Sequence, residues 1–295
     1  MVTETKHYRL ANKITDESFE LQKLANYHLY LAIGKQVIRA AVADTVRNKF
    51  ILLEDYELSN IFTPLQAAQQ VQDILQGHAF FKLSTWKEIR VAIKNQSFTL
   101  VPEALFDPKA EADYLKLNCN LDPYHEQVLS YHHSAVDAVN IFAADNYLTS
   151  VLSEAYPGKP IRYVHQTSAL ITALLHYGER NGQVKMYGYV EKNSLTIIIF
   201  RDGALIFCNM FHYQSPEDFM YFLVFVMQEQ RLNPDKDPVT IWGDITHDSR
   251  LFMLMRKYIR QVYFGSRPPG VAFSYKLEEQ FEHRFLDVYS LHFAE

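Results

Sequence analysis

The sequence predicts an α/β protein of two lobes, each with a mixed β-sheet flanked by helices. The first observation is the length of 295 residues, which exceeds the usual size of a single domain. The second is the composition, with 48% apolar and 21% charged residues, typical of a chain that folds throughout. The third is a repeated order of strands and helices. Together these observations favour two separate cores over one.

Composition and charge exclude several classes of function. The formal charge of −5 comes from 29 basic and 34 acidic residues without a basic block, so no nucleic-acid partner is expected. Only Cys119 and Cys208 are present, far apart in the sequence, which is typical of the reducing cytoplasm. The N-terminus is polar and lacks an export signal. The most apolar stretch, 219–227, is shorter than the roughly 20 residues that cross a bilayer, so no direct membrane insertion is expected.

The first half of the chain predicts a lobe spanning 27–180, preceded by a polar tail over 1–26 with one edge strand at 18–22. Thr63 and Pro64 are typical of a helix N-cap and first position, and Asp145 is placed to cap a second helix. Strands are expected at 27–33, 37–43, 50–56, 88–94 with 97–101 as its continuation, 127–134, 135–143 and 161–165, and helices at 65–75, 110–117, 145–155 and 167–176.

The second half predicts a lobe spanning 181–295, after a polar boundary at 178–182 that contains two glycines. Ser215 and Pro216 mark a strong helix start, and the helix that follows is apolar on every face, so we expect it to be buried on both sides. Strands are expected at 184–190, 195–200, 204–213, 239–245 and 271–275, and helices at 219–227, 251–262 and 281–291, the last with the option of packing back on the first lobe.

The two halves align when the turn at Gly34 is placed on the turn at Glu191, an offset of 191 − 34 = 157 residues. Both copies then run strand, strand, strand, helix, strand. This duplicated layout resembles the superfamily of actin, the heat-shock 70 chaperones and the sugar kinases, which implies the actin-like ATPase (ribonuclease H-like) fold with a nucleotide between the lobes.

Two narrower resemblances follow from short motifs. Phe200-Arg201-Asp202-Gly203 at a strand end is similar to the actin-like protein of type IV pilus assembly. Across nearly the whole chain, the sequence also resembles the bacterial family called domain of unknown function 3822. The motifs that carry this second resemblance are Val101 to Phe106, Asn140 to Ala143 and the strand and helix around His165.

The superfamily resemblance implies a phosphate site at the first hairpin, where active members carry Asp-x-Gly and the Asp helps hold hydrated magnesium. Here Ala32-Ile33-Gly34-Lys35-Gln36 takes that place, so the glycine alone is kept. Magnesium is usually held by one or two carboxylates and the substrate phosphates, so loss of the carboxylates removes most of the protein's ligands for the metal. We expect no catalytic residue and no metal ligand at this hairpin.

The second hairpin and the adenosine motif also depart from the pattern that the resemblance implies. Tyr189 takes the place of the second Asp, and Glu191 that of a glycine. Lys35 and Lys192 have two interpretations, phosphate-binding charges or solvated turn lysines, of which the second is favoured. Gly243 keeps one of two expected glycines. The interlobe cleft candidates are therefore Gly34, Lys35, Gln36, Lys192, Asn193, Gly243 and Asp244.

Trp242 and Asp244 each keep two interpretations. Trp242 is interpreted as a core residue or as a base-stacking residue, and the core is favoured because strand aromatics usually pack inward. Asp244 is placed to hold a ribose hydroxyl or to cap the next helix, with capping favoured. Elsewhere, His125, His132, His133 and Asp137 lack the spacing of a metal site, and the chain holds no Gly-x-Ser-x-Gly elbow and no Walker loop.

These departures favour a degenerate, non-hydrolysing actin-like protein that acts as a scaffold or as a subunit of a homo-oligomer. The expected partner is a protein, no cofactor is expected, and the 20 Phe and 19 Tyr supply candidate interface anchors. The alternative is an ATP-binding protein or slow ATPase with a rebuilt phosphate site. Sugar-kinase-like phosphotransfer ranks last, because neither hairpin supplies a positioned base.

Overall fold

The computed structural model describes residues 7–177 and 184–294, in two compact units. Unit 1 comprises Met1–Thr172, Gly270–Gln280 and Asp287–Glu295, and unit 2 comprises Ala173–Pro269 and Phe281–Leu286. The division expected at 180/181 differs from these units, because the chain passes from unit 1 to unit 2 inside a helix and later returns twice to unit 1. The polar boundary predicted at 178–182 lies outside the described residues.

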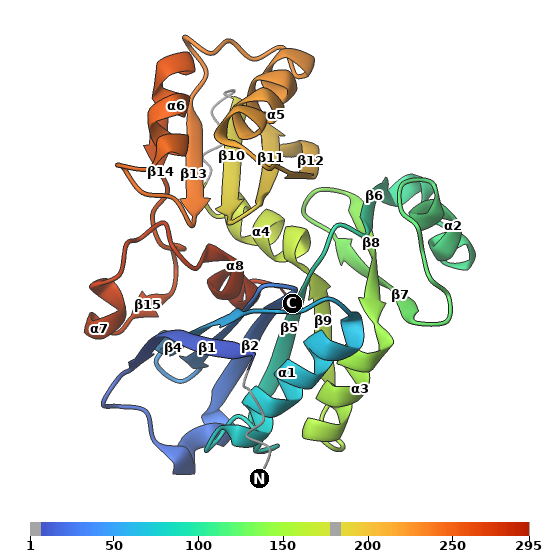
Figure 1. Cartoon of the computed structure of the whole chain (residues 1–295), viewed down its shortest axis with the longest axis vertical. Coiled ribbons are helices and arrows are strands. Elements are labelled where there is room, and N and C mark those ends of the chain that lie inside the picture. The colour runs from blue at the N-terminus through green and yellow to red at the C-terminus, as the bar shows by residue number, and fades with distance from the viewer. Residues whose placement is uncertain (1–6, 178–183, 295) are drawn as a thin grey trace. The chain divides into compact units, whose positions relative to one another are not determined.

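Unit 1 is built on a seven-stranded sheet in the described part of the chain, drawn mostly in blue and green in Figure 1, with β15 in red. Its order is β1-β4-β3-β2-β5-β9, with β15 beside β4. The strands β1 to β4 are antiparallel neighbours, whereas β2, β5 and β9 run parallel. Their bounds are β1 Tyr8–Thr15, β2 Tyr27–Gly34, β3 Val37–Asp44, β4 Lys49–Leu58, β5 Glu88–Lys94, β9 Ile161–His165 and β15 Ala272–Phe273.

Helices cover this sheet, and the sequence determines where the main ones begin. The helix α1 begins at the predicted N-cap Thr63, which forms a capping box: Thr63 accepts from the Gln66 amide and the Gln66 side chain accepts from the Thr63 amide. Asp145 caps α3, as predicted, because its side chain accepts from the Leu148 amide. The helices α1 and α3 lie side by side (Figure 1). Outside residues 98–145, the helical segments of unit 1 are η1 Leu21–Asn26, α1 Pro64–Gly77, α3 Asn146–Ala155, α7 Tyr275–Glu278 and η4 Ser290–His292, while α4 Gln166–Leu175 and α8 Leu286–Tyr289 cross from one unit to the other.

A separate three-stranded sheet in unit 1 corrects one prediction. The segment expected to continue β5 is instead β6, which pairs with β8 in the order β6-β8-β7. The turn at Asn95 separates the two strands, because its side chain accepts from the Ser97 amide and donates to the Ala143 carbonyl. The elements are β6 Phe98–Pro102, η2 Glu103–Leu105, η3 Pro108–Ala110, α2 Glu111–Lys116, β7 Glu126–His133 and β8 Ala138–Asp145.

Unit 2 repeats the order of the unit 1 sheet with five strands in its described part, β12-β11-β10-β13-β14. Again three antiparallel strands precede two parallel ones, which matches β4-β3-β2-β5-β9. The helices α5 and α6 pack on one face of this sheet over a shared apolar core (Figure 1). The elements are β10 Val184–Glu191, β11 Ser194–Arg201, β12 Ala204–His212, α5 Pro216–Glu229, β13 Val239–Gly243, α6 Arg250–Tyr258 and β14 Val262–Phe264.

Besides the strand assigned to β5, four further predictions about elements are wrong. The N-terminal edge strand is β1, not 18–22, and because only Ile14 of its residues is buried, its sequence resembles a tail. The helix predicted over 251–262 ends at Tyr258, because Val262 begins β14. The closing helix is short, since Phe285 has φ 62° directly before α8. Finally, α5 is buried on one side only.

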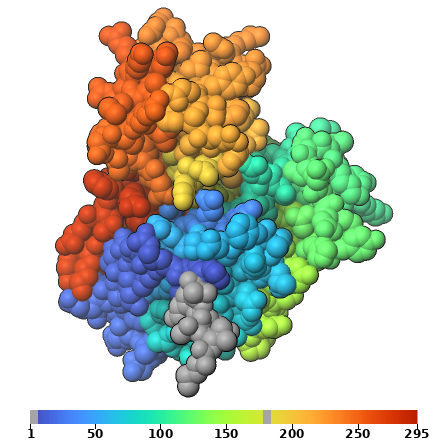
Figure 2. All heavy atoms as spheres, in the orientation of Figure 1, coloured from blue at the N-terminus to red at the C-terminus, as the bar shows by residue number. Residues whose placement is uncertain are grey.

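Burial along α5 shows why the last prediction fails. Phe219, Leu223 and Met227 are buried in the core of unit 2, whereas Tyr221 is 63% exposed and Phe225 is 43% exposed. Tyr221 and Phe225 stack on each other with ring centroids 6.0 Å apart. The orange segment that contains α5 lies at the surface in the space-filling view (Figure 2). Because the helix is apolar on every face, the side that does not pack on the core presents aromatic side chains at the surface.

Candidate functional site

The carboxyl ends of β2, β5 and β9 are the place where ligands generally bind to an open α/β sheet. The first predicted hairpin lies there. Gly34 ends β2 opposite Lys94, and a Cβ on Gly34 would stand 3.2 Å from the Cβ of Lys94. Lys35 and Gln36 are exposed, and the Gln36 carbonyl accepts from the Leu58 amide at 2.9 Å. Ala32 is fully buried behind them.

A buried charge cluster occupies this edge of unit 1. Lys94 ends β5 with its side chain 4% exposed, and its ammonium pairs with Asp287 Oδ2. The same oxygen accepts from Arg39 Nη1 at 3.0 Å, and Arg39 Nε donates to Asp55 Oδ1 at 3.1 Å. Because Arg39 pairs with Ala32 across the sheet, the cluster lies beside the position where the resemblance implies the metal-binding Asp.

A buried histidine closes the end of β9. His165 is fully buried, its Nε2 donates to the Asn95 carbonyl at 3.0 Å, and its Nδ1 lies 2.7 Å from Thr167 Oγ1. Asn140 donates to both Thr167 and Ser168 at 2.8 Å. Burial lowers the pKa of His165 to about 4, so the ring is neutral at pH 7. The end of β9 is therefore filled by hydrogen bonds within the protein.

In unit 2, the second predicted hairpin ends β10 and begins β11. Lys192 is exposed, the Asn193 carbonyl accepts from the Tyr213 amide at 3.1 Å, and Tyr213 Oη donates to the Glu191 carbonyl at 2.6 Å. Tyr189, which stands where the resemblance implies an Asp, is 3% exposed. The hairpin is thus held by its own backbone and by one tyrosine.

Gly243 ends β13 next to this hairpin, at a point where its backbone lies very close to the backbone of Val190. Its φ is 103°, and a Cβ there would lie 2.0 Å from the Val190 carbonyl oxygen. The Asp244 amide donates to the same carbonyl at 2.7 Å. His283 clamps the turn from the other side, because its carbonyl accepts from the Gly243 amide at 2.8 Å and its Nε2 donates to the Ile245 carbonyl at 2.7 Å.

Trp242 is a core residue, as the sequence favoured. It is 1% exposed, it donates from Nε1 to the Ser266 carbonyl at 2.9 Å, and a Cβ on Gly265 would lie 1.7 Å from its ring. Asp244 does not cap α6, which corrects that prediction, since the N-cap is Ser249. The Asp244 carboxylate instead pairs with Arg284 Nη2 at 3.5 Å.

Comparison with known proteins assigns the chain to a protein family. The family model described as "Protein of unknown function (DUF3822)" matches residues 16–262. The chain belongs to this family. Among curated proteins, none matches the sequence.

Solved structures of low identity share the fold of this DUF3822 protein. A Bacteroides thetaiotaomicron protein with actin-like ATPase fold and unknown function has 21% identity and a TM-score of 0.76, over 84% of this chain and 93% of that one. A chain of the PilM–PilN type IV pilus biogenesis complex has 14% identity and a TM-score of 0.57, over 91% of this chain and 98% of that one. The DUF3822 protein therefore has the actin-like ATPase fold.

The seven candidate residues of the DUF3822 protein divide between the units. Gly34 ends β2 in unit 1 and Lys35 and Gln36 form the turn that follows, whereas the other four lie at one edge of unit 2, where Val190 pairs with Gly243. Whether all seven serve one ligand stays a prediction. Sequence reasoning missed the cluster around Asp287 and the His283 clamp. Arg39 left a signal, because it is a cation inside the otherwise apolar run 37–43, whereas Lys94 ends a strand that also contains Glu88 and Arg90.

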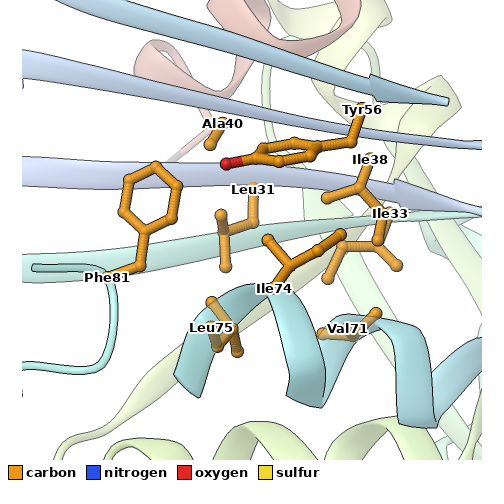
Figure 3. Close-up of a pocket in the computed structure, with 9 residues that line it drawn as sticks. All are labelled: Leu31, Ile33, Ile38, Ala40, Tyr56, Val71, Ile74, Leu75 and Phe81. Carbon is orange, nitrogen blue, oxygen red and sulfur yellow. The ribbon is translucent and has the colours of Figure 1, made fainter. Parts of the chain in front are cut away.

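Other places in the DUF3822 protein offer less chemistry. Over residues 7–177 and 184–294, no three His, Cys, Asp or Glu side chains gather as metal ligands, and no helix is long and apolar enough to span a bilayer. A small pocket lies between α1 and the sheet, and its nine lining side chains, which include Leu31, Tyr56 and Phe81, are shown in Figure 3. The Tyr56 hydroxyl donates to Glu54, so the pocket presents an apolar wall.

Proposed function

We propose that this DUF3822 protein is a non-hydrolysing actin-like protein that acts through protein contacts, as a scaffold or as a subunit of a homo-oligomer. One observation carries the proposal: buried Ala32 and buried Tyr189 stand where active relatives would present magnesium-binding carboxylates. Magnesium held without those carboxylates depends on the nucleotide phosphates alone. Loss of the metal ligands removes hydrolysis and leaves the two-unit scaffold.

Two further features support protein contacts. The similar pilus protein was solved in a complex with PilN, so the fold serves a protein partner there. In this chain, Tyr221 and Phe225 form an exposed aromatic surface on α5, and aromatic side chains are favoured anchors at interfaces. The alternative, that large side chains merely fill the cores, does not account for side chains that are 63% and 43% exposed.

A second candidate function is nucleotide binding through a rebuilt phosphate site, with ATP as the possible ligand. It is favoured by Lys35 and Lys192, which are exposed at the ends of the corresponding hairpins of the two units. A lysine binds phosphate as a point charge. Gln36 and Asn193 would add hydrogen-bond donors from the same two turns.

Thermal unfolding with and without millimolar ATP and magnesium separates the two functions. A ligand at roughly 100 times its dissociation constant adds about 2.7 kcal/mol to the free energy of unfolding. We expect no shift of the melting temperature and no release of phosphate. A saturable shift that disappears in the Lys35→Met/Lys192→Met variant would overturn the proposal in favour of nucleotide binding. Tyr221→Ser/Phe225→Ser is the matched test of protein contacts, and it should weaken self-association or partner binding.

A further inference from the structure

Two buried cations of the unit 1 sheet converge on one carboxylate oxygen. Arg39 reaches Asp287 Oδ2 from β3 and Lys94 reaches it from β5, and the three side chains are 2%, 4% and 0% exposed. Cations placed this way, in a desolvated site with fixed geometry, form a strong anion-binding site. The anion here is part of the chain itself.

The charges of the cluster show why an anion is required. The sheet contributes the cations Arg39 and Lys94 and one carboxylate, Asp55, which pairs with Arg39. Without Asp287, these three groups carry a net positive charge in a buried place. Leaving a buried charge uncompensated is strongly destabilising, whereas an anion of suitable size restores the balance.

Asp287 also marks a division in the chain. It is the first residue of the C-terminal segment that belongs to unit 1, directly after Leu286 of unit 2. The rest of the segment is bound on the same face, because Arg90 Nη1 donates to the carbonyls of Leu291 and His292 at 3.0 Å. Occupation of the anion site therefore coincides with docking of residues 287–294.

We propose that Arg39 and Lys94 form an anion-binding site at the carboxyl end of β2 and β5, and that Asp287 occupies it as a tethered carboxylate ligand. The ligand class is a small carboxylate, since the site is shaped around the side chain of an aspartate. The C-terminal segment is a strap that this site holds on unit 1. This inference is independent of the protein-contact function, because it concerns the unit 1 edge alone.

Chemical rescue of Asp287→Gly tests the site. Removal of the side chain leaves both cations and a space of carboxylate size, so the variant should melt well below the wild-type protein. Sodium formate should restore it in a saturable way, with a rise of about 4 °C at roughly ten times the dissociation constant. Wild-type protein should show no such rise. Phosphate, a larger oxyanion, should rescue less than formate.

Two control variants make the test decisive. Asp287→Asn fills the space with a neutral amide, so it should be destabilised and should not respond to formate. Asp287→Gly/Lys94→Met keeps the space but has one cation fewer, so it should need at least about tenfold more formate. Limited proteolysis should cut residues 281–287 faster in Asp287→Gly and slow again with formate.

Several results would overturn the anion site. They are an Asp287→Asn variant as stable as wild type, a glycine variant that no anion rescues, and rescue by sodium chloride equal to that by formate. An ATP-induced shift of the wild-type protein would instead contradict the protein-contact function and leave the anion site untouched.

Discussion

The carboxyl ends of β2 and of β10 occupy corresponding places in two sheets with the same strand order, yet they are closed by different means. In unit 1, buried ion pairs from Arg39 and Lys94 to Asp287 fill the space at the strand end. In unit 2, the backbone of Gly243 packs against Val190 and is clamped by His283. A repeated topology therefore fixes the path of the backbone but leaves the chemistry at its ends free to diverge.

Both strand ends depend on residues between 283 and 287, close to the C-terminus. His283 belongs to unit 2 and Asp287 to unit 1, so two residues one helical turn apart in sequence serve different units. Unit 1 depends on charge, and unit 2 depends on close packing without a Cβ. Changes to these groups should therefore have different signatures in salt, pH and side-chain volume.

The largest expected effect is that of Arg39→Met in unit 1. The substitution keeps much of the apolar stem but removes the guanidinium that pairs with both buried carboxylates, Asp55 and Asp287. Removing one partner of a buried ion pair typically costs about 3–5 kcal/mol, and urea denaturation measures that loss. Arg9→Met is the matched control, since its ion pair with Glu57 is largely exposed and should show no measurable loss. Equal losses for both variants would contradict a closure by buried charge.

A smaller effect is expected in unit 2 for Gly243→Ala. The new Cβ would meet the Val190 carbonyl oxygen at 2.0 Å, at a φ of 103° that other residues rarely adopt. Strain and overpacking together should cost about 3 kcal/mol. The chain has two tryptophans, Trp86 in unit 1 and Trp242 in unit 2, so fluorescence of a Trp86→Phe variant follows unit 2 alone.

The control for this glycine lies in unit 1. Gly158 also has positive φ, at 71°, but a Cβ there would meet nothing within 4 Å. Gly158→Ala should cost only the backbone strain of about 1 kcal/mol. If Gly243→Ala is no worse than Gly158→Ala, the close approach to Val190 does not hold unit 2 together.

Local sequence patterns were sufficient for the meanders and for the helix starts. The strands β2, β3 and β4 and the capping residues Thr63, Asp145 and Ser215 follow from alternation and from side-chain hydrogen bonds within four residues. The strand β6 could not be assigned to its sheet in this way. Its partner β8 lies about 40 residues onward, and no local signal selects that partner over β5.

The candidate site shows the same limit more sharply. A cation inside an apolar run signals that Arg39 has a buried partner, but the sequence does not show which acid pairs with Arg39 or with Lys94 at the end of β5. Asp287 is 193 residues from Lys94 and 248 from Arg39. Gly243 was selected for ligand binding, whereas its positive φ and contact with Val190 depend on a strand pairing that only the tertiary structure reveals.

The smallest expected effects compare the helix that follows the third strand of each meander. Both α1 and α5 begin with a capping box and a proline, Thr63 with Gln66 in unit 1 and Ser215 with Asp218 in unit 2. Thr63→Ala and Ser215→Ala should each cost about 1 kcal/mol, because each removes the acceptor for one amide of the first turn. Urea denaturation with the two tryptophans as local probes measures each loss in its own unit.

The charge of the third helical residue sharpens this comparison. Asp218 adds a negative charge near the positive end of the α5 dipole, whereas Gln66 is neutral, so Gln66→Glu should stabilise unit 1 by about 0.5 kcal/mol. Asp218→Asn should destabilise unit 2 by a similar amount, and added salt should shrink both differences. A loss for Ser215→Ala that is much larger than the loss for Thr63→Ala, and that salt does not change, would contradict this expectation. It would mean that packing of the aromatic surface on α5 depends on the cap. The two copies would then have diverged at the helix start as well as at the strand ends.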